Sequence, residues 1–464
     1  MKATILRTLS IATLFAAQAA AQAGVVADHP GRWMGEITIP NGPVLKLGAD
    51  LFSRADGSPW ASMASPDQGQ YDLPLKALTE NGGSADLVLP FGVLALTWEG
   101  DHFKGMWKQG GESFPLTLRQ VAEFPRQARP QTPQAPFPYT DETLAIAGGD
   151  GVKLGATLSV PKGVKRPPAV VLVHGSGPST RDADIAGHQH FRVLADYLAR
   201  HGIAVLRYDK RGNGRSSGDF GTLTTSKLVD DAQGALRALR TSKRFARVGL
   251  LGLSEGSGLS AAVAARAPGE ADFVVSMAGV GLPGVDLIVL QDRIETMDAG
   301  ATPEEADRVV AYAGMYYRTI MANEDADARM AALKTLQEAQ PDAVALLAKY
   351  KMAHGSLRLE EARKPWLRTL LQSDPRTDWR KLGVPVLVLN GSLDHQVPAQ
   401  DNVAAIVGAL RAGGNNKVES AIMPNLNHLF QTAKTGSTAE YATIDETVAP
   451  AALARVATFI GRQR

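Results

Sequence analysis

The chain contains no cysteine, has almost no excess charge of either sign and has no apolar run long enough to cross a bilayer. The absence of cysteine excludes disulfides, thiolate metal sites and a cysteine nucleophile. Because 49 Lys and Arg face 47 Asp and Glu, a net charge of +2 argues against binding nucleic acid by broad phosphate neutralisation. No stretch approaches the roughly 18 consecutive apolar residues of a membrane helix, so we expect no integral membrane association.

The first 23 residues are typical of an export signal. Lys2 and Arg7 form a short basic region, Leu9 to Ala17 is apolar, and Ala21-Gln22-Ala23 is a small-x-small cleavage site. We therefore expect residues 1–23 to be a signal peptide and the mature protein to be periplasmic or extracellular.

The remaining sequence divides into two units joined by a linker. Residues 24–123 contain short alternating runs separated by turn residues, which predicts a small antiparallel β domain. Five prolines between residues 124 and 139 predict an extended, semi-stiff linker. Residues 140–464 form the second and larger unit.

The second unit alternates strands and helices after an opening hairpin. The apolar runs AVVLVHG, IAVLRYD, VGLLGLS, FVVSMAG and VPVLVLNG are separated by amphipathic helices. This pattern predicts an α/β fold with a mostly parallel sheet that is buried on both faces. The alternation stops between Gly281 and Leu382, where helical segments form an insertion. We interpret the insertion, about residues 284–380, as a cap over the edge of the sheet.

Two segments match the pattern G-x-S-x-G, and their context separates them. Residues 214–218 lie in a polar, glycine-rich loop with no helix directly after them. Residues 252–256 follow a strand directly and open an Ala-rich helix, which is the setting of a nucleophile elbow. We therefore predict that Ser254 is a nucleophile and that Ser216 is a loop residue.

Chain order then selects the partners, because an elbow serine is followed first by an acid and then by a histidine. Only His395 and His428 lie beyond the point where the strands resume. Asp394 follows a late strand, but its direct neighbour His395 would point away from it. His428, 34 residues after Asp394, can return on a loop. We predict Asp394 as the acid and His428 as the base, with Asp286 as the alternative acid.

Acyl transfer also needs donors for a developing oxyanion. The glycine-rich segment at residues 174–178 follows the strand AVVLV, where such a loop belongs. We predict that the backbone N–H groups of Ser176 and Glu255 form the oxyanion hole.

Other patterns carry no function in our interpretation. The match to G-x-G-x-x-G at residues 279–284 is interrupted by Pro283 and lacks the following βαβ unit, so dinucleotide binding is not expected. His188 and His190 are interpreted as the solvated start of a helix rather than as metal ligands. We predict that the chemistry requires no cofactor and no metal.

Residues 140–464 resemble the bacterial α/β-hydrolase carboxylesterases with an inserted helical cap, which are related to serine-aminopeptidase-like hydrolases. The similarity is carried, in order, by the segments HGSGPSTRD, LRYDKRGNGRSSGDF, LGLSEGSG, VPVLVLNGSLDHQVP and NLNHLFQ. It implies the α/β-hydrolase fold, Ser254, Asp394 and His428 as the triad, and activity on acyl esters of modest size. The family more often has His at position 253 and Gly at position 257. Leu253 and Ser257 are therefore expected to alter the pocket lining.

Three functions remain open at this stage. The favoured one is a serine ester hydrolase for small to medium acyl esters, and the second is a peptidase, aminopeptidase or thioesterase with the same triad. The third is an envelope- or polysaccharide-binding protein with a vestigial hydrolase domain, because four of the six tryptophans lie in the first unit. Burial in the core is the expected role of these tryptophans. The sequence leaves the oligomeric state open.

Overall fold

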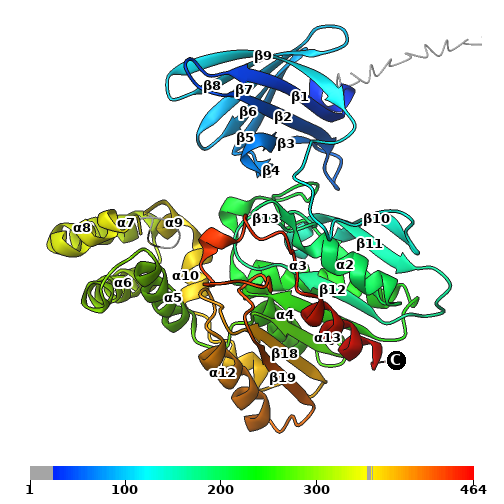
Figure 1. The fold of residues 1–464 in the computed structure, drawn as a ribbon, viewed down its shortest axis with the longest axis vertical. Coiled ribbons are helices and arrows are strands. Elements are labelled where there is room, and N and C mark those ends of the chain that lie inside the picture. Colours follow the sequence, from blue (N-terminus) through cyan, green and yellow to red (C-terminus); the bar gives the residue numbers. More distant parts are fainter. Residues whose placement is uncertain (1–23, 353–356, 358, 464) are drawn as a thin grey trace, which may run out of the picture.

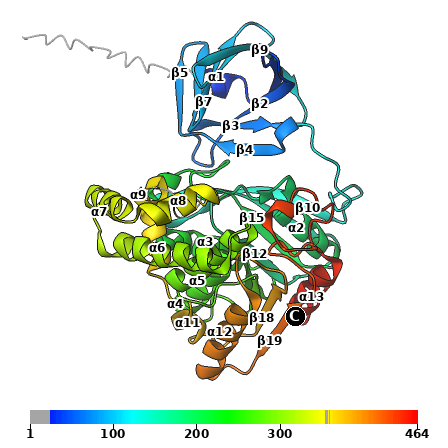
Figure 2. The same cartoon turned by 60° about the vertical axis from the view of Figure 1, so that its left-hand side comes forward.

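The computed structural model describes residues 24–352, 357 and 359–463, so the predicted signal peptide lies outside the described residues. Figure 1 shows a β domain above a larger α/β domain, and Figure 2 shows the same arrangement from another side. Both predicted architectures, an antiparallel β domain and a mostly parallel sheet with a helical insertion, are present.

The β domain is one antiparallel sheet in the order β4-β3-β2-β1-β9-β8-β7-β6-β5. Its elements are α1 (Val25–Asp28), β1 (Gly31–Thr38), β2 (Val44–Ser53), β3 (Pro59–Ser65), η1 (Pro66–Gln68), β4 (Gln70–Pro74), β5 (Ala77–Asn81), β6 (Ser84–Leu89), β7 (Gly92–Trp98), β8 (Phe103–Gln109) and β9 (Glu112–Val121). Trp33 and Trp107 are buried in its core, and Trp60 and Trp98 pack against that core. The tryptophans therefore serve packing, which removes the observation that favoured a sugar-binding face.

The α/β domain is built on an eight-stranded sheet in the order β10-β11-β15-β12-β16-β17-β18-β19. The strands are β10 (Tyr139–Ala147), β11 (Lys153–Pro161), β12 (Ala169–Val173), β15 (Ala204–Tyr208), β16 (Val248–Leu253), β17 (Val274–Met277), β18 (Val386–Gly391) and β19 (Val418–Met423). From β15 to β19 all neighbours are parallel, whereas β10 and β11 form the predicted antiparallel hairpin. A small ribbon, β13 (Asp184–Ile185) and β14 (His188–Gln189), lies apart.

Helices cover both faces of this sheet, which is why the central strands are apolar throughout. One face carries α2 (His190–Arg200) and α13 (Pro450–Gly461). The other carries α3 (Thr225–Thr241), α4 (Glu255–Arg266) and α12 (Ala399–Ala412). The short helices η2 (Gly149–Gly151), η3 (Phe220–Thr222) and η5 (Thr438–Glu440) lie in loops. Within residues 24–352 and 359–463, no helix combines the length and apolarity that a bilayer crossing requires.

The insertion between β17 and β18 is helical, and its first helices stand beside the sheet as a cap (Figure 1). It comprises α5 (Gly284–Asp298), α6 (Pro303–Ala322), α7 (Ala326–Ala339), α8 (Pro341–Lys349), α9 (Leu359–Arg363), α10 (Pro365–Leu371) and α11 (Arg376–Trp379). The cap has its own core, with Tyr312, Tyr316 and Tyr317 fully buried. Trp379 of α11 instead packs with α12 and β18, so the insertion returns to the sheet there.

The proline-rich linker is attached to the α/β domain and is not a free spacer. Arg129 is buried, and its guanidinium donates hydrogen bonds to the backbone carbonyls of Ile444 (2.8 Å) and Ala442 (2.7 Å). Gln131 donates to the carbonyl of Val448 at 2.7 Å. These bonds attach the linker to the α/β domain, which its composition does not predict.

The β domain also contacts the α/β domain directly, through the side on which β4 lies (Figures 1 and 2). The hydroxyl of Thr180, in the loop after β12, donates to the carboxylate of Asp72 at 2.9 Å. The N–H of Ala55 donates to the carbonyl of Arg215 at 2.7 Å. The β domain therefore rests on the loop that contains the predicted oxyanion donor Ser176.

Candidate active site

Ser254 lies between the end of β16 and the start of α4, in a left-handed backbone conformation with φ 57° and ψ −126°. Such a conformation costs a non-glycine residue about 1–3 kcal/mol and turns the side chain away from both elements. The flanking glycines are required sterically. A Cβ on Gly252 would lie 2.1 Å from the carbonyl oxygen of Gly256, and one on Gly256 would lie 2.2 Å from that of Val173. The local structure is thus the predicted nucleophile elbow.

Asp394 and His428 come together as a buried pair. The His428 Nδ1 lies 3.0 and 2.9 Å from the two carboxylate oxygens of Asp394. The Oδ1 of Asp394 also accepts the backbone N–H groups of Gln396 (2.9 Å) and Val397 (2.8 Å). With Nδ1–H donating to the carboxylate, Nε2 is left with a free lone pair, as a general base requires. Among the described residues, none forms a hydrogen bond with this Nε2.

The rival candidates lie elsewhere. Asp286, the alternative acid, is in the first turn of α5, while the carboxylate bonded to His428 is that of Asp394. His395 has its own partner, because its Nδ1 lies 2.7 Å from the carboxylate of Asp298.

Ser254 and His428 line the same cavity of about 440 Å³. No hydrogen bond joins their side chains in the part of the chain that the structure describes. Nucleophile–base contacts are commonly long without substrate and tighten in the Michaelis complex. The structure therefore brings the predicted acid Asp394 and the predicted base His428 into contact, and Ser254 lines the same cavity as His428.

The two predicted oxyanion donors border this cavity as well. Ser176 follows β12, Glu255 is the first residue of α4, and both line the cavity. Within the described residues, neither N–H donates to a protein acceptor. The loop after β12 lies close to Ser254, since a Cβ on Gly175 would lie 3.1 Å from the Cβ of Ser254. Free N–H groups beside Ser254, one at a helix N-terminus, are able to stabilise a developing oxyanion.

Glu255 connects the elbow to the cap, which the sequence did not reveal. Its Oε1 accepts a hydrogen bond from the indole N–H of Trp366 on α10 at 2.8 Å. Glu255 is buried, and its Oε2 has no hydrogen-bond partner among the described residues. No sequence pattern links position 255 to position 366, because the contact depends on how the cap folds back.

The cap supplies part of the apolar wall of the cavity and several acidic groups. The carboxyl-bearing lining residues are Asp184, Glu255, Asp292, Glu295 and Glu361, and the described lining contains no Lys or Arg. Arg126 and Lys364 pair with two of them, Asp184 and Glu361. Burial raises the pKa of Asp292 to about 8, although the hydroxyl of Tyr317 donates to it at 2.6 Å. Two of the five carboxyls are therefore ion-paired, and burial favours the neutral form of a third.

The two departures from the family pattern have different outcomes. Leu253 lines the cavity as expected. Ser257 does not line it, because its hydroxyl lies beneath the elbow, 2.6 Å from that of Ser276. The expectation for Ser257 is thus wrong, since a helical residue three positions after the nucleophile faces the sheet.

The histidines His188 and His190 are not solvated, contrary to expectation. Both are fully buried, and their rings bond to Thr447 and Tyr441 and to the carbonyl of Leu429, respectively. They hold the loop that carries His428 and the C-terminal segment against α2. In the described residues no group of three or more His, Cys, Asp or Glu is arranged to hold a metal.

Ser216, the other G-x-S-x-G serine, is also buried and bonds to the carbonyl of Asp209.

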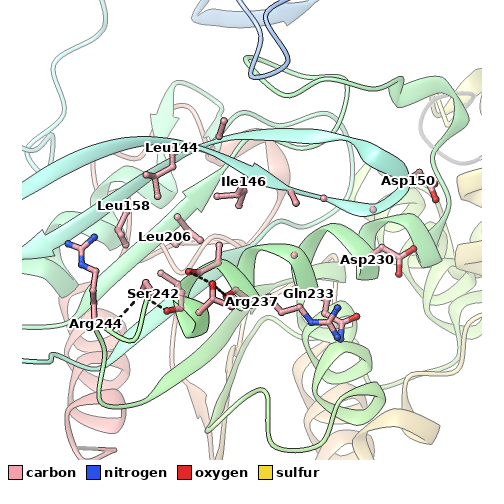
Figure 3. A pocket seen from close by; sticks show the side chains of 18 residues that line it. Leu144, Ile146, Asp150, Leu158, Leu206, Asp230, Gln233, Arg237, Ser242 and Arg244 are labelled. Atoms are coloured by element: carbon pink, nitrogen blue, oxygen red, sulfur yellow. Dashed lines mark hydrogen bonds between the residues drawn. The ribbon is translucent and has the colours of Figure 1, made fainter.

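A larger hollow of about 740 Å³ lies between the β10–β11 hairpin and α3 (Figure 3). It has an apolar floor that includes Leu144 and Ile146, and arginines at its rim. Those arginines are paired, Arg237 with Glu270 and Arg244 with Glu142. None of the predicted catalytic residues lines it, so volume alone does not identify the site.

Comparison with known proteins fits this geometry. A family model described as serine aminopeptidase, S33, matches residues 166–432, which contain Ser254, Asp394 and His428. The chain belongs to this family of α/β hydrolases. The predicted resemblance, fold class and enzyme class, a hydrolase, are confirmed.

Individual relatives are esterases by name. Esterase EstD of Thermotoga maritima is 29% identical over 334 residues, covering 71% of this chain and 68% of that protein. The esterase Pf2001 of Pyrococcus furiosus is 17% identical over 73% of this chain and 96% of its own, with a TM-score of 0.43. Est1E of Butyrivibrio proteoclasticus, solved with ferulic acid, is 15% identical over 69% of this chain and 96% of its own, with a TM-score of 0.41.

Proposed function

We propose that the protein is a serine ester hydrolase that cleaves small to medium acyl esters through an acyl-enzyme intermediate. The observation that carries the proposal is the buried Asp394–His428 pair, whose free Nε2 faces the cavity that Ser254 lines. The esterase names of the relatives support an ester as the bond that is cleaved.

Each group has a role that follows from its environment. His428 takes the proton of Ser254 as Oγ attacks the ester carbonyl, and Asp394 holds the imidazole in the required tautomer. The N–H groups of Ser176 and Glu255 stabilise the oxyanion. His428 then protonates the leaving alcohol, and water, deprotonated by the same histidine, releases the acid from Ser254. No step requires a cofactor.

The size of the cavity and its walls support acyl groups of modest length. Its volume is about 440 Å³, and the cap contributes the apolar side chains of Leu287, Ile288, Leu367 and Leu370. A hydrophobic wall of this kind binds alkyl chains without fixing their exact length.

The test is the Ser254→Ala variant with p-nitrophenyl butyrate as substrate. The proposal requires turnover to fall by about 10⁴-fold or more. Ser260→Ala, on the helix α4 that follows Ser254, removes only a hydroxyl bonded to the Gly256 carbonyl and serves as the matched control. Near wild-type turnover by Ser254→Ala would refute the assignment.

An aminopeptidase reaction is the second candidate, because the matching family model is described as a serine aminopeptidase. The same triad would attack an amide or a thioester. A panel of matched butyryl esters, aminoacyl amides and thioesters distinguishes the three by kcat/KM, and our proposal requires the esters to be the best substrates.

We also propose that the enzyme acts after export, in the periplasm or outside the cell. The support is the basic-apolar-small pattern of residues 1–23. N-terminal sequencing of protein from a fractionated bacterial host tests this, with Gly24 as the expected first residue.

A further inference from the structure

Lys210 is buried directly behind the predicted oxyanion loop. It follows β15, its side chain is only 2% exposed, and its ammonium donates two hydrogen bonds. The acceptors are the backbone carbonyls of Gly175, at 2.6 Å, and Gly177, at 2.9 Å. These two residues flank Ser176, whose N–H is the predicted oxyanion donor.

The geometry of the peptide bond connects the lysine to that donor. The carbonyl of Gly175 and the N–H of Ser176 belong to one planar trans peptide and point to opposite sides of it. Holding the carbonyl against Lys210 therefore directs the N–H away from Lys210. If this peptide rotated by half a turn, a carbonyl oxygen would replace the N–H and would repel an oxyanion.

The loop requires these hydrogen bonds because its glycine-rich sequence does not by itself fix the orientation of the Gly175–Ser176 peptide. Gly177 has φ 80°, and glycines on both sides of Ser176 allow many peptide orientations. The end of β15 holds the rest of this loop as well. The N–H of Lys210 donates to the carbonyl of Ser179 at 3.1 Å, and the carbonyl of Tyr208 accepts from His174 Nε2 at 2.7 Å.

A lysine is costly to bury, so a merely space-filling role would favour an apolar residue. Burial lowers the pKa of Lys210, while the carboxylates of Glu255 and Asp231 favour its charged form. Two loop carbonyls accept hydrogen bonds from the buried ammonium, and the carboxylate of Glu255, next to Ser254, stabilises its charge.

We propose that Lys210 is a positioning residue that holds the Gly175–Ser176 peptide with its N–H directed at the oxyanion. This role rests on the proposed function, because the oxyanion forms only if Ser254 attacks an acyl group. Lys210 does not touch the substrate in this account. It should therefore affect the stabilisation of the transition state more than the binding of the ester.

The first experiment compares Lys210→Met with the wild type and with Lys165→Met, an exposed lysine. We expect Lys210→Met to lower kcat by about 10- to 100-fold while KM changes by less than about threefold. The inhibition constant of a trifluoromethyl ketone, which forms an oxyanion on Ser254, should rise in parallel with the fall in kcat/KM. An unchanged kcat, or an inhibition constant that does not follow kcat/KM, would overturn the proposal.

The second experiment separates the hydrogen bonds from packing. Because the chain has no cysteine, Lys210→Cys introduces a single thiol that can be alkylated in the unfolded protein before refolding. Bromoethylamine restores an ammonium at the length of lysine, whereas 1-bromopropane gives an apolar side chain of the same length. The wild type carried through the same steps is the reference.

We expect the aminoethyl protein to recover most of its kcat and the propyl protein to stay at the level of Lys210→Met. Equal activity of the two refolded proteins would show that the ammonium has no role. The Ser254→Ala variant keeps the two proposals apart. If it retains activity, the proposed function fails, and if it is inactive while the Lys210 proteins behave alike, only the positioning role fails.

Discussion

The imidazole of His428 is oriented by the two carboxylate oxygens of Asp394, one of which, Oδ1, is itself held by two backbone N–H groups. Replacing Asp394 with Asn keeps the shape but substitutes a neutral amide that can donate to Nδ1. The ring would then carry its proton on Nε2 and lose its function as a base. We predict that Asp394→Asn lowers kcat by about 10⁴-fold in steady-state assays with p-nitrophenyl butyrate.

The chain offers a matched control for this prediction. Asp298 accepts from His395 Nδ1 at 2.7 Å, so it forms a second Asp–His pair outside the proposed triad. Asp298→Asn should leave kcat within about twofold, since exposed pairs contribute little. A comparable loss in both variants would contradict the assignment of Asp394.

Asp292 connects a buried carboxyl in the cap to pH-dependent stability. Its pKa is raised to about 8 by burial, with the charge of Glu295 acting in the same direction. Between about pH 4 and pH 8 the folded state holds a proton that the unfolded state releases. The free energy of unfolding therefore falls as pH rises from about 4 to about 8, by up to about 1.4 kcal/mol per pH unit. Below about pH 4 this group makes no contribution to the pH dependence of stability, because it is protonated in both states.

We predict that Asp292→Asn removes this slope. Urea unfolding at pH 5 and pH 8 should show the variant gaining stability relative to the wild type at the higher pH. A difference between the two proteins that is the same at both pH values would show that Asp292 is not protonated in the folded state.

At the scale of single residues, the sequence predicted the groups that local context defines. The strand–turn–helix setting predicted the tight turn at Ser254, and chain order predicted the pairing of Asp394 with His428; the structure contains both. The sequence did not identify Lys210 or Trp366, because their contacts are with residues 33 to 111 positions away. It also misassigned His188 and His190, whose burial depends on the C-terminal segment packing over them.

At the scale of secondary-structure elements, periodicity was a sufficient guide. The strands of the parallel sheet are buried on both faces, so their sequences are continuous apolar runs that stand out from the helices. The helical insertion was predicted because the alternation of strands and helices stops there, and in the structure its helix α6 begins with a capping box at Thr302. Proline content predicts a stiff, extended linker but not the hydrogen bonds of Arg129 to the α/β domain, because those bonds depend on the tertiary fold.

The hydrogen bond between Trp366 of α10 and Glu255 of α4 tests whether the cap and the elbow act as one unit. Trp366→Phe keeps the ring in place but leaves both carboxylate oxygens of Glu255 without a partner. Since an unsatisfied buried acceptor costs about 1–3 kcal/mol, and more when it is charged, we predict a lower Tm and a fall in kcat/KM of about tenfold.

Thermal unfolding and ester kinetics check this prediction. Trp98→Phe, in the β domain, makes the same chemical change far from the cavity and should leave kcat/KM unaltered. If Trp366→Phe has the kinetics of the wild type, the hydrogen bond between the cap and Glu255 has no role in catalysis, and the cap only lines the cavity.

At the scale of the whole molecule, the nearly neutral chain encloses a cavity whose described lining carries acids but no Lys or Arg. Electrostatic complementarity governs discrimination between partners of equal size. We predict that the p-nitrophenyl monoester of succinate is cleaved with a kcat/KM about tenfold lower than the butyrate ester, which has a similar length. Added salt should reduce the difference in kcat/KM between the two esters. Equal kcat/KM values for the two esters at low salt would contradict the prediction.

The identity of the nucleophile is the claim on which the rest depends, and covalent labelling tests it most directly. The protein is treated with a fluorophosphonate, and the labelled peptide is identified by mass spectrometry. The account predicts one adduct per chain, on Ser254, formed at a rate that falls in Asp394→Asn. Stoichiometric labelling of a different residue, or full ester hydrolysis by a protein that the reagent does not modify, would contradict it.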